Sequence, residues 1–104
     1  MPGKLIVFEG VEGSGKSTQL VKLQQWLQAH ESFQKLQAIE TIPALVTTRE
    51  PGGTALGQSL RTLLLNHQPE VALGARAELL LYAADRAQHL EEVIRPALQE
   101  GSWV

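Results

Sequence analysis

The apolar positions of the chain fall into two kinds of pattern. Residues 4–8 (KLIVF) form a continuous apolar run that ends before a glycine-rich stretch, which predicts a short strand buried on both faces. Residues 44–48 (ALVTT) predict a second strand, and residues 102–104 (SWV) predict the start of a third. Leucines three or four positions apart predict a helix over residues 17–30 and another that has Thr54 as its N-cap.

A longer helical pattern covers residues 73–98. Pro96 should kink or end it near Arg95, because proline lacks a backbone N–H and its ring clashes with the preceding turn. The mixed stretch over residues 31–43 is typical of a loop or an irregular helix end, and it suggests no function. The alternation of strands and helices predicts an α/β fold, a three-layer α/β/α arrangement with a parallel sheet, in a single domain over residues 1–104.

Composition narrows the classes of function. The 104 residues carry a formal net charge of −2, which argues against a broad surface for nucleic acid or membrane. The absence of cysteine excludes disulfides and cysteine-bound metals. His30, His67 and His89 show no metal-ligand spacing and are expected at the surface or at helix ends. No segment approaches the roughly 20 apolar residues of a membrane span, and the first residues lack a signal-peptide core. A soluble cytoplasmic protein is therefore expected.

Residues 10–17 (GVEGSGKS) match the phosphate-binding pattern G-x-x-x-x-G-K-[S/T] between a predicted strand and a predicted helix. Glycines let the backbone curl so that its N–H groups face one anion, and the helix N-terminus adds its dipole. Lys16 can reach the β- and γ-phosphates, and the Ser17 hydroxyl can ligate Mg²⁺. The sequence thus predicts ATP binding with Mg²⁺ as cofactor, by Gly10, Val11, Glu12, Gly13, Ser14, Gly15, Lys16, Ser17 and Thr18.

Three further features bear on the reaction, since this loop alone serves many chemistries. Glu12 lies inside the loop, where it either points to solvent or accepts a hydrogen bond from a second substrate. Turn chemistry explains the Pro-Gly-Gly of residues 48–54 (TREPGGT), but not the Arg–Glu pair before it. Glu78, Tyr82 and Arg86 share one helix face, which is either a solvated Glu–Arg ladder or a ring and an arginine for a nucleotide base.

Taken in order, FEGVEGSGKST, TREPGGT and YAADRA resemble the thymidylate kinase family from Leu5 to the last residue. The resemblance implies transfer of the ATP γ-phosphoryl group to thymidine monophosphate (dTMP). It implies that Glu12 contacts the sugar 3′-hydroxyl and that Arg61 binds the monophosphate. Lys16 and Arg61 would be the catalytic residues.

Other residues take substrate roles by the same resemblance. Arg49 and Glu50 would lie beside Arg61, Tyr82 would stack on thymine in place of the usual phenylalanine, and Arg86 would bond the base edge. The Glu50–Pro51 peptide is cis in some relatives, although trans is the commoner state of X–Pro bonds.

The chain also departs from the family pattern. Gly13 stands where one branch of the family has a catalytic arginine; other members supply that charge from a later lid. The lid, the C-terminal strands and an Asp–Arg pair have no counterpart here. We therefore expect the N-terminal part of one P-loop kinase domain, truncated after about the third strand and nearly inactive alone. The full-length protein would be a possible homodimer through the apolar side of residues 79–94.

Two other functions stay open. One is a kinase for another nucleoside monophosphate, which should lack TREPGGT. The other is a module that binds a nucleotide without transferring phosphate, which would not need Arg61, Tyr82 and Arg86 to converge.

Overall fold

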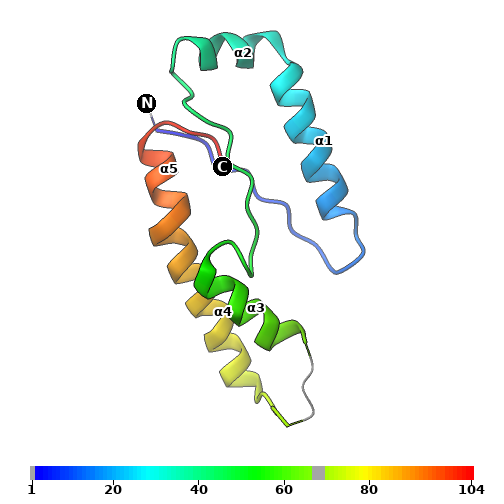
Figure 1. The fold of residues 1–104 in the computed structure, drawn as a ribbon. Helices are drawn as coiled ribbons and strands as arrows, with labels where there is room; N and C mark the ends of the chain where they lie inside the picture. The colour runs from blue at the N-terminus through cyan, green and yellow to red at the C-terminus, as the bar shows by residue number, and fades with distance from the viewer. Residues whose placement is uncertain (1, 67–69) are drawn as a thin grey trace. The chain divides into compact units, whose positions relative to one another are not determined.

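The structure, a computed structural model, describes residues 2–66 and 70–104, which form helices joined by loops (Figure 1). The elements in chain order are α1 (Lys16–Ala29), α2 (Glu31–Ala38), α3 (Ala55–Leu65), α4 (Ala75–His89), the π-helical segment η1 (Leu90–Ile94) and α5 (Arg95–Gln99). The chain forms two compact units. One consists of Met1–Thr47 with Ala97–Val104, and the other of Thr48–Pro96.

The predicted α/β/α fold with a parallel sheet is wrong: the part of the chain that the structure describes contains no β-strand. The three extended segments meet only at single points. Leu45 and Trp103 form an isolated parallel bridge, while Val104 accepts from the Ile6 amide and donates to the Lys4 carbonyl. A ladder needs successive pairings along a strand. Here the Ser102 amide is already bonded to a helical carbonyl, so the segment around Trp103 cannot extend the pairing backward.

The first apolar run is also less buried than its pattern predicts. Leu5 is 47% exposed and Val7 is 62% exposed, so the prediction of a strand covered on both faces is wrong for this structure. A continuous apolar run indicates only which side chains could be buried; it does not supply the element that would cover them.

Three helices can be compared directly with the elements expected from the apolar and polar positions of the sequence. Helix α1 confirms the expected helix over residues 17–30, and α3 confirms the helix after Thr54, whose hydroxyl accepts from the Gly57 amide at 2.9 Å. Helix α2 corrects the expectation of a loop or an irregular helix end over residues 31–43, because residues 31–38 form a regular helix. It forms because Phe33 buries its ring against neighbouring apolar side chains, a tertiary contact that the polar composition of the stretch conceals.

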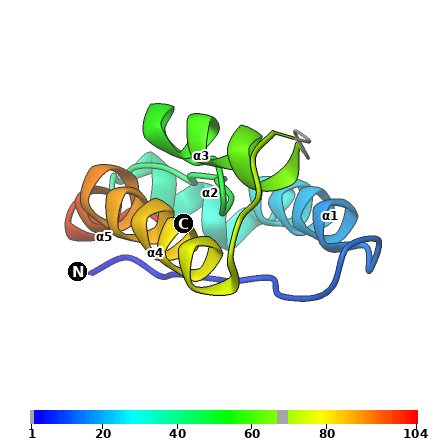
Figure 2. The same cartoon turned by 90° about the horizontal axis from the view of Figure 1, so that it is seen from below.

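The helical backbone does not end before Pro96, although an end or a kink near Arg95 was expected from its position. In η1 the Arg95 amide bonds to the Leu90 carbonyl, five residues back, and α5 then continues to Gln99. Pro96 therefore sits in the first turn of α5, where a missing N–H costs least. Helix α3 lies beside α4 in both views (Figures 1 and 2). None of the described helices is long and apolar enough to cross a bilayer.

A small apolar core holds the first unit together. Leu27, Phe33 and Ile42 are buried, and the Phe33 and Trp103 rings meet edge to face with centroids 5.4 Å apart. Burying each such side chain stabilises the fold by about 1.5–3 kcal/mol. Phe33 is thus part of this core, whereas the Trp26 side chain is 60% exposed.

Candidate functional site

The glycine-rich loop of the first unit is curled. Gly13 has φ of 77° and Gly15 has φ of 94°, values that other residues adopt only with strain. The Ser14 amide bonds to the Val11 carbonyl at 3.1 Å and closes the turn, after which α1 begins at Lys16. The loop thus leads directly into a helix N-terminus.

This loop has the features of an anion site. Within the described parts of the chain, no hydrogen bond engages the amides of Gly13, Gly15 or Lys16. The first turn of α1 has no acidic residue, so its dipole is not neutralised. The Lys16 ammonium folds back to the Gly10 carbonyl at 2.5 Å, and its remaining N–H groups are oriented by that bond. One curled loop therefore carries unengaged backbone donors and a cation at the start of a helix.

Ser17 and Thr18 are exposed on the first turn of α1 and line an open pocket of about 460 Å³. The described residues include no group of three or more His, Asp or Glu that could bind a metal by itself. Mg²⁺ in nucleotide sites usually binds through phosphate oxygens, water and one or two protein oxygen ligands, so the lack of such a group does not bear on it.

The TREPGGT turn of the second unit is held by two helices. From α3, Arg61 Nη1 donates to the Pro51 carbonyl at 2.8 Å and Gln58 Nε2 donates to the Gly52 carbonyl at 2.6 Å. From α4, Asp85 Oδ1 accepts from the Gly52 amide at 3.0 Å. The Glu50–Pro51 peptide is cis, the state that some relatives suggested. These bonds fix the backbone of the turn on both sides.

Sequence reasoning missed Asp85 and His89, which lie one helical turn apart on α4. They are only 1% and 2% exposed. His89 Nδ1 lies 2.7 Å from Glu50 Oε2, and its Nε2 lies 2.7 Å from the Thr48 hydroxyl. His89 is the last residue of α4, which is one of the two positions expected for the histidines, but it is buried rather than at the surface. The i, i+4 spacing of two polar residues in a mainly apolar helix was the signal that could have found them.

The other two histidines are not part of the site as the structure describes it. His30 is exposed and contacts the Trp26 ring. His67 lies outside the described residues.

Glu50 joins the turn to α4. Burial alone would raise the pKa of its carboxyl, but hydrogen bonds from His89 and Arg86, together with their charges, outweigh burial and hold the pKa below the ordinary value of 4.5. Arg86 Nε donates to Glu50 Oε1 at 2.8 Å. Each oxygen of the carboxylate therefore has its own donor on α4.

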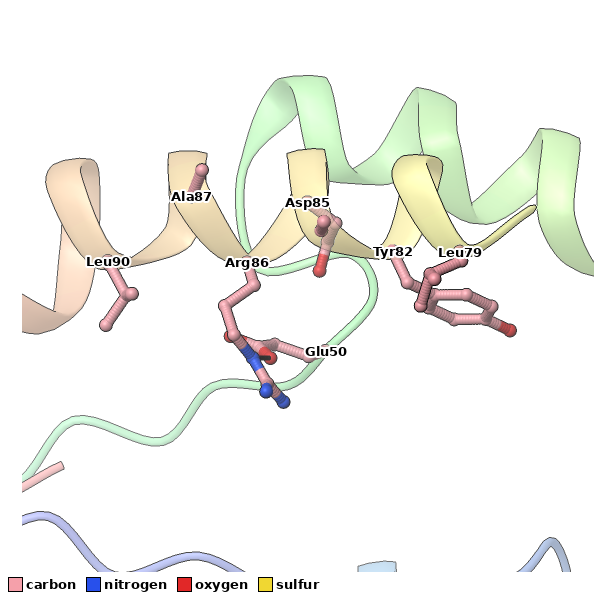
Figure 3. Close-up of a pocket in the computed structure, with 8 residues that line it drawn as sticks. Glu50, Leu79, Tyr82, Asp85, Arg86, Ala87 and Leu90 are labelled. Atoms are coloured by element: carbon pink, nitrogen blue, oxygen red, sulfur yellow. Dashed lines mark hydrogen bonds and ion pairs between the residues drawn. The ribbon is translucent and has the colours of Figure 1, made fainter. Parts of the chain in front are cut away.

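An open pocket of about 600 Å³ lies along this face of α4. Figure 3 shows Arg86 reaching away from the helix to Glu50, with the Tyr82 ring and Leu79 toward one end and Leu90 toward the other. The pocket is lined by Glu50, Leu79, Tyr82, Ala83, Asp85, Arg86, Ala87 and Leu90. An aromatic ring, a cation and aliphatic side chains in one hollow are suited to a flat heterocycle.

Two further arginines converge on Gly52. A Cβ atom on Gly52 would lie 3.0 Å from Arg61 Cδ and 3.5 Å from Arg49 Nε. Two guanidinium-bearing side chains against one glycine form a place where an anion could be held. Neither arginine lines the α4 pocket itself.

The structure thus brings some predicted site residues together and not others. Glu50, Tyr82 and Arg86 share the α4 pocket, and Arg49 and Arg61 flank the same turn. Glu78 shares their helix but is not among the residues that line the pocket. Glu12 is exposed in the curled loop and makes no hydrogen bond to any described residue.

Comparison with known proteins gives the family. The model of the family described as thymidylate kinase matches residues 8–104. The chain belongs to the thymidylate kinase family. This confirms the resemblance noted in the three sequence motifs.

Curated thymidylate kinases align over the whole chain. A relative from Cyanothece sp. (strain PCC 7425 / ATCC 29141) is 54% identical over 108 residues, covering 100% of this chain and 45% of the relative. Relatives from Prochlorococcus marinus (strain NATL2A) and Trichodesmium erythraeum (strain IMS101) are 52% and 54% identical, and the chain again covers 46% and 48% of them. The chain spans about half the length of the curated thymidylate kinases that it matches.

Proposed function

We propose that this chain is the N-terminal part of a kinase that transfers the γ-phosphoryl group of ATP to dTMP, giving the diphosphate. The observation that carries the proposal is the curled loop over residues 10–17, with uncommitted amides and Lys16 at the start of α1. Membership of the thymidylate kinase family supports the choice of reaction.

The donor side would use the curled loop. The amides of Gly13, Gly15 and Lys16 and the Lys16 ammonium would cradle the β- and γ-phosphates, because a set of donors on one curled loop binds phosphate without side-chain rearrangement. Thr18 would lie near the α-phosphate. Ser17 would hold Mg²⁺, which when bound neutralises the charge that develops on the transferred group.

The base and the monophosphate of the acceptor would be bound by residues of the second unit. Tyr82 would stack on thymine and Arg86 would bond the base edge, since both line one pocket. Arg49 and Arg61 would hold the monophosphate beside Gly52, where the two side chains converge. Glu12 would accept a hydrogen bond from the sugar 3′-hydroxyl.

The chemistry asked of the protein is mostly alignment. Lys16 would draw negative charge toward the donor phosphates, and Arg61 would shield the acceptor phosphate so that two anions can approach each other. Both are therefore assigned as catalytic residues. The homodimer expected for the full-length protein, through the apolar side of residues 79–94, remains a proposal that sedimentation can test.

Thermal stabilisation tests the choice of substrate. A ligand that binds only the folded state raises stability by RT ln(1 + [L]/Kd), about 2.7 kcal/mol at 100 times Kd. We expect dTMP to raise the Tm of the chain more than the monophosphates of adenosine, guanosine or cytidine, and Mg-ATP to add a separate increment. Equal shifts with all four monophosphates would favour a kinase of broader or different specificity.

A matched pair of variants locates the binding. Tyr82→Ala should abolish most of the dTMP-dependent shift while leaving the Mg-ATP shift intact. Leu80→Ala serves as control, because Leu80 is 66% exposed on the same helix and does not line the pocket. Loss of the dTMP shift in the Leu80 variant would place the nucleotide elsewhere and contradict the assignment of Tyr82.

A further inference from the structure

His89 is a buried titratable side chain that the proposed reaction does not use directly. Its side chain is 3% exposed, so it cannot touch a nucleotide in the α4 pocket. Both ring nitrogens are nevertheless engaged, with Glu50 and with Thr48, at 2.7 Å each. Both partners belong to the TREPGGT turn. A buried ring that commits both nitrogens to one turn constrains that turn.

The proton on the ring can be assigned from its partner. Because the pKa of Glu50 is held below its ordinary value, the side chain is a carboxylate near neutral pH and can only accept hydrogen bonds. His89 Nδ1 must therefore carry a proton and donate it to Glu50 Oε2. This donor fixes one oxygen of the carboxylate from the interior of the second unit.

The other oxygen of the same carboxylate faces the pocket. Glu50 Oε1 accepts from Arg86 Nε at 2.8 Å, and the Arg86 side chain is 68% exposed beside Tyr82 (Figure 3). A carboxylate bound at Nε restricts rotation of the planar guanidinium, because the bond is directional as well as charged. The orientation of Arg86 thus depends on how firmly Glu50 is held from behind.

The surrounding backbone leaves room for the ring. A Cβ atom on Gly53 would lie 2.6 Å from His89 Nε2 and 2.7 Å from the Thr48 hydroxyl, so a larger residue there would displace the imidazole. Asp85 bonds the Gly52 amide one helical turn away. Helix α4 therefore binds the turn at residues 48, 50 and 52, which are alternate positions along it.

We infer that His89 is a positioning residue for nucleotide recognition, which sets the affinity for the acceptor nucleotide by holding Glu50 so that Glu50 orients Arg86. The inference rests on the proposed function, since it requires the pocket at Tyr82 and Arg86 to hold the base. It deepens that function by naming a residue that never touches the substrate.

Two substitutions of similar polarity separate the two ring contacts. In His89→Asn the amide nitrogen lies two bonds from Cβ, as Nδ1 does, and can still donate to Glu50. In His89→Gln it lies three bonds from Cβ, as Nε2 does, and can reach Thr48 but not the Glu50 oxygen. The experiment measures kcat and KM for dTMP and for ATP in the full-length kinase that carries this chain.

We expect His89→Gln to raise the KM for dTMP by about tenfold, the loss typical of one charge-assisted hydrogen bond. In His89→Asn the KM for dTMP should stay within about threefold of the value for the unsubstituted protein. The KM for ATP should not change in either variant. A purely structural role for His89 would instead lower stability in both variants without separating dTMP from ATP.

The route through Glu50 is tested in a double-mutant cycle. If His89 acts through Glu50, His89→Gln should have no further effect on the KM for dTMP in the Glu50→Gln background. The inference is overturned if His89→Gln raises the KM for dTMP by the same factor in that background. It is also overturned if His89→Asn and His89→Gln have the same KM for dTMP. If the unsubstituted protein neither binds nor phosphorylates dTMP, the proposed function fails and the inference fails with it. If the unsubstituted protein is active and the two His89 variants have the same KM for dTMP, only the inference fails.

Should neither His89 variant fold, the unsubstituted protein gives a second measurement. The ring nitrogens of His89 can be followed by NMR during titration with dTMP and, separately, with Mg-ATP. We expect Nδ1 to be protonated and the ring signals to shift with dTMP but not with Mg-ATP alone. Ring signals that are unchanged at saturating dTMP would overturn the inference.

Discussion

At the scale of single residues, the second unit depends more on polar contacts than on an apolar core. Its most buried side chains include Asp85 and His89, and each is satisfied by the TREPGGT turn. No buried side-chain polar atom in the described residues lacks a hydrogen-bond partner. Fully paired buried groups are costly to disturb, because removing one partner leaves the other desolvated and unpaired.

This arrangement predicts a specific dependence of stability on pH. Glu50 has a lower pKa in the folded state than its ordinary value of 4.5, so the unfolded state binds a proton more readily. The stability that Glu50 contributes is therefore present above the unfolded pKa and is lost as the pH falls through the folded value. We expect urea unfolding between about pH 6 and pH 3 to show a difference between the unsubstituted chain and Glu50→Gln that shrinks as the pH falls. A difference that stays constant over this range would contradict the assignment.

At the scale of elements, the contact between α3 and α4 depends on one glycine. Gly57 is buried in the first turn of α3, and a Cβ atom there would lie 2.5 Å from Asp85 Oδ1 and 3.1 Å from the Thr54 hydroxyl. The close approach lets Asp85 reach the TREPGGT turn while Thr54 caps α3. Gly57 is therefore kept for space rather than for backbone conformation.

Gly57→Ala sets helix propensity against packing. Propensity alone would stabilise the protein by up to about 1 kcal/mol, because alanine is the better helix former. We expect a loss of about 1–3 kcal/mol instead, since the added methyl group must displace Asp85 or Thr54. Gly74→Ala, at the N-cap of α4, is a comparison for steric space alone, because no atom lies within 4 Å of its Cβ position. Denaturant unfolding of both variants decides the matter, and a stabilised Gly57→Ala protein would refute this account of the contact.

Local signals predicted local structure well. The cap at Thr54, the span of α1 and the curl of the glycine loop all follow from a few neighbouring residues, and the structure has each of them. Pairing between distant segments could not be read in the same way. The run over residues 4–8 indicated a strand, yet whether it pairs depends on partners far along the chain, and the described residues provide only isolated contacts.

In the candidate site, too, features that depend on neighbouring residues were predicted and those that depend on distant residues were not. Glu50, Tyr82 and Arg86 were predicted from short motifs and do share a pocket. Asp85 and His89 were not, because a polar residue in a helix is normally solvated, and only the folded turn supplies their partners. Helix α2 was missed for a related reason, since the burial of Phe33 outweighs a polar local sequence.

At the scale of the whole molecule, the expected activity depends on how much of its relatives' length the chain covers. The chain spans about half the length of its curated relatives, and we have proposed that it is the N-terminal part of a longer kinase. Residues 10–17 include no arginine, so the curled loop could not itself share the charge that would develop on the phosphoryl group in the proposed reaction. Thymidylate kinases of this kind are expected to bring that charge from a later segment.

We therefore expect the 104-residue chain to bind nucleotides but to turn over at least about a thousand times more slowly than the full-length kinase, the effect typical of losing one such arginine. A coupled assay for ADP, run with equal concentrations of the two proteins, measures the ratio. The thermal shift with dTMP serves as the control, because it shows that low turnover does not come from an unfolded chain. Turnover within about tenfold of the full-length protein would mean that Lys16 and the arginines of the second unit suffice for transfer, since a missing transition-state arginine costs far more than that.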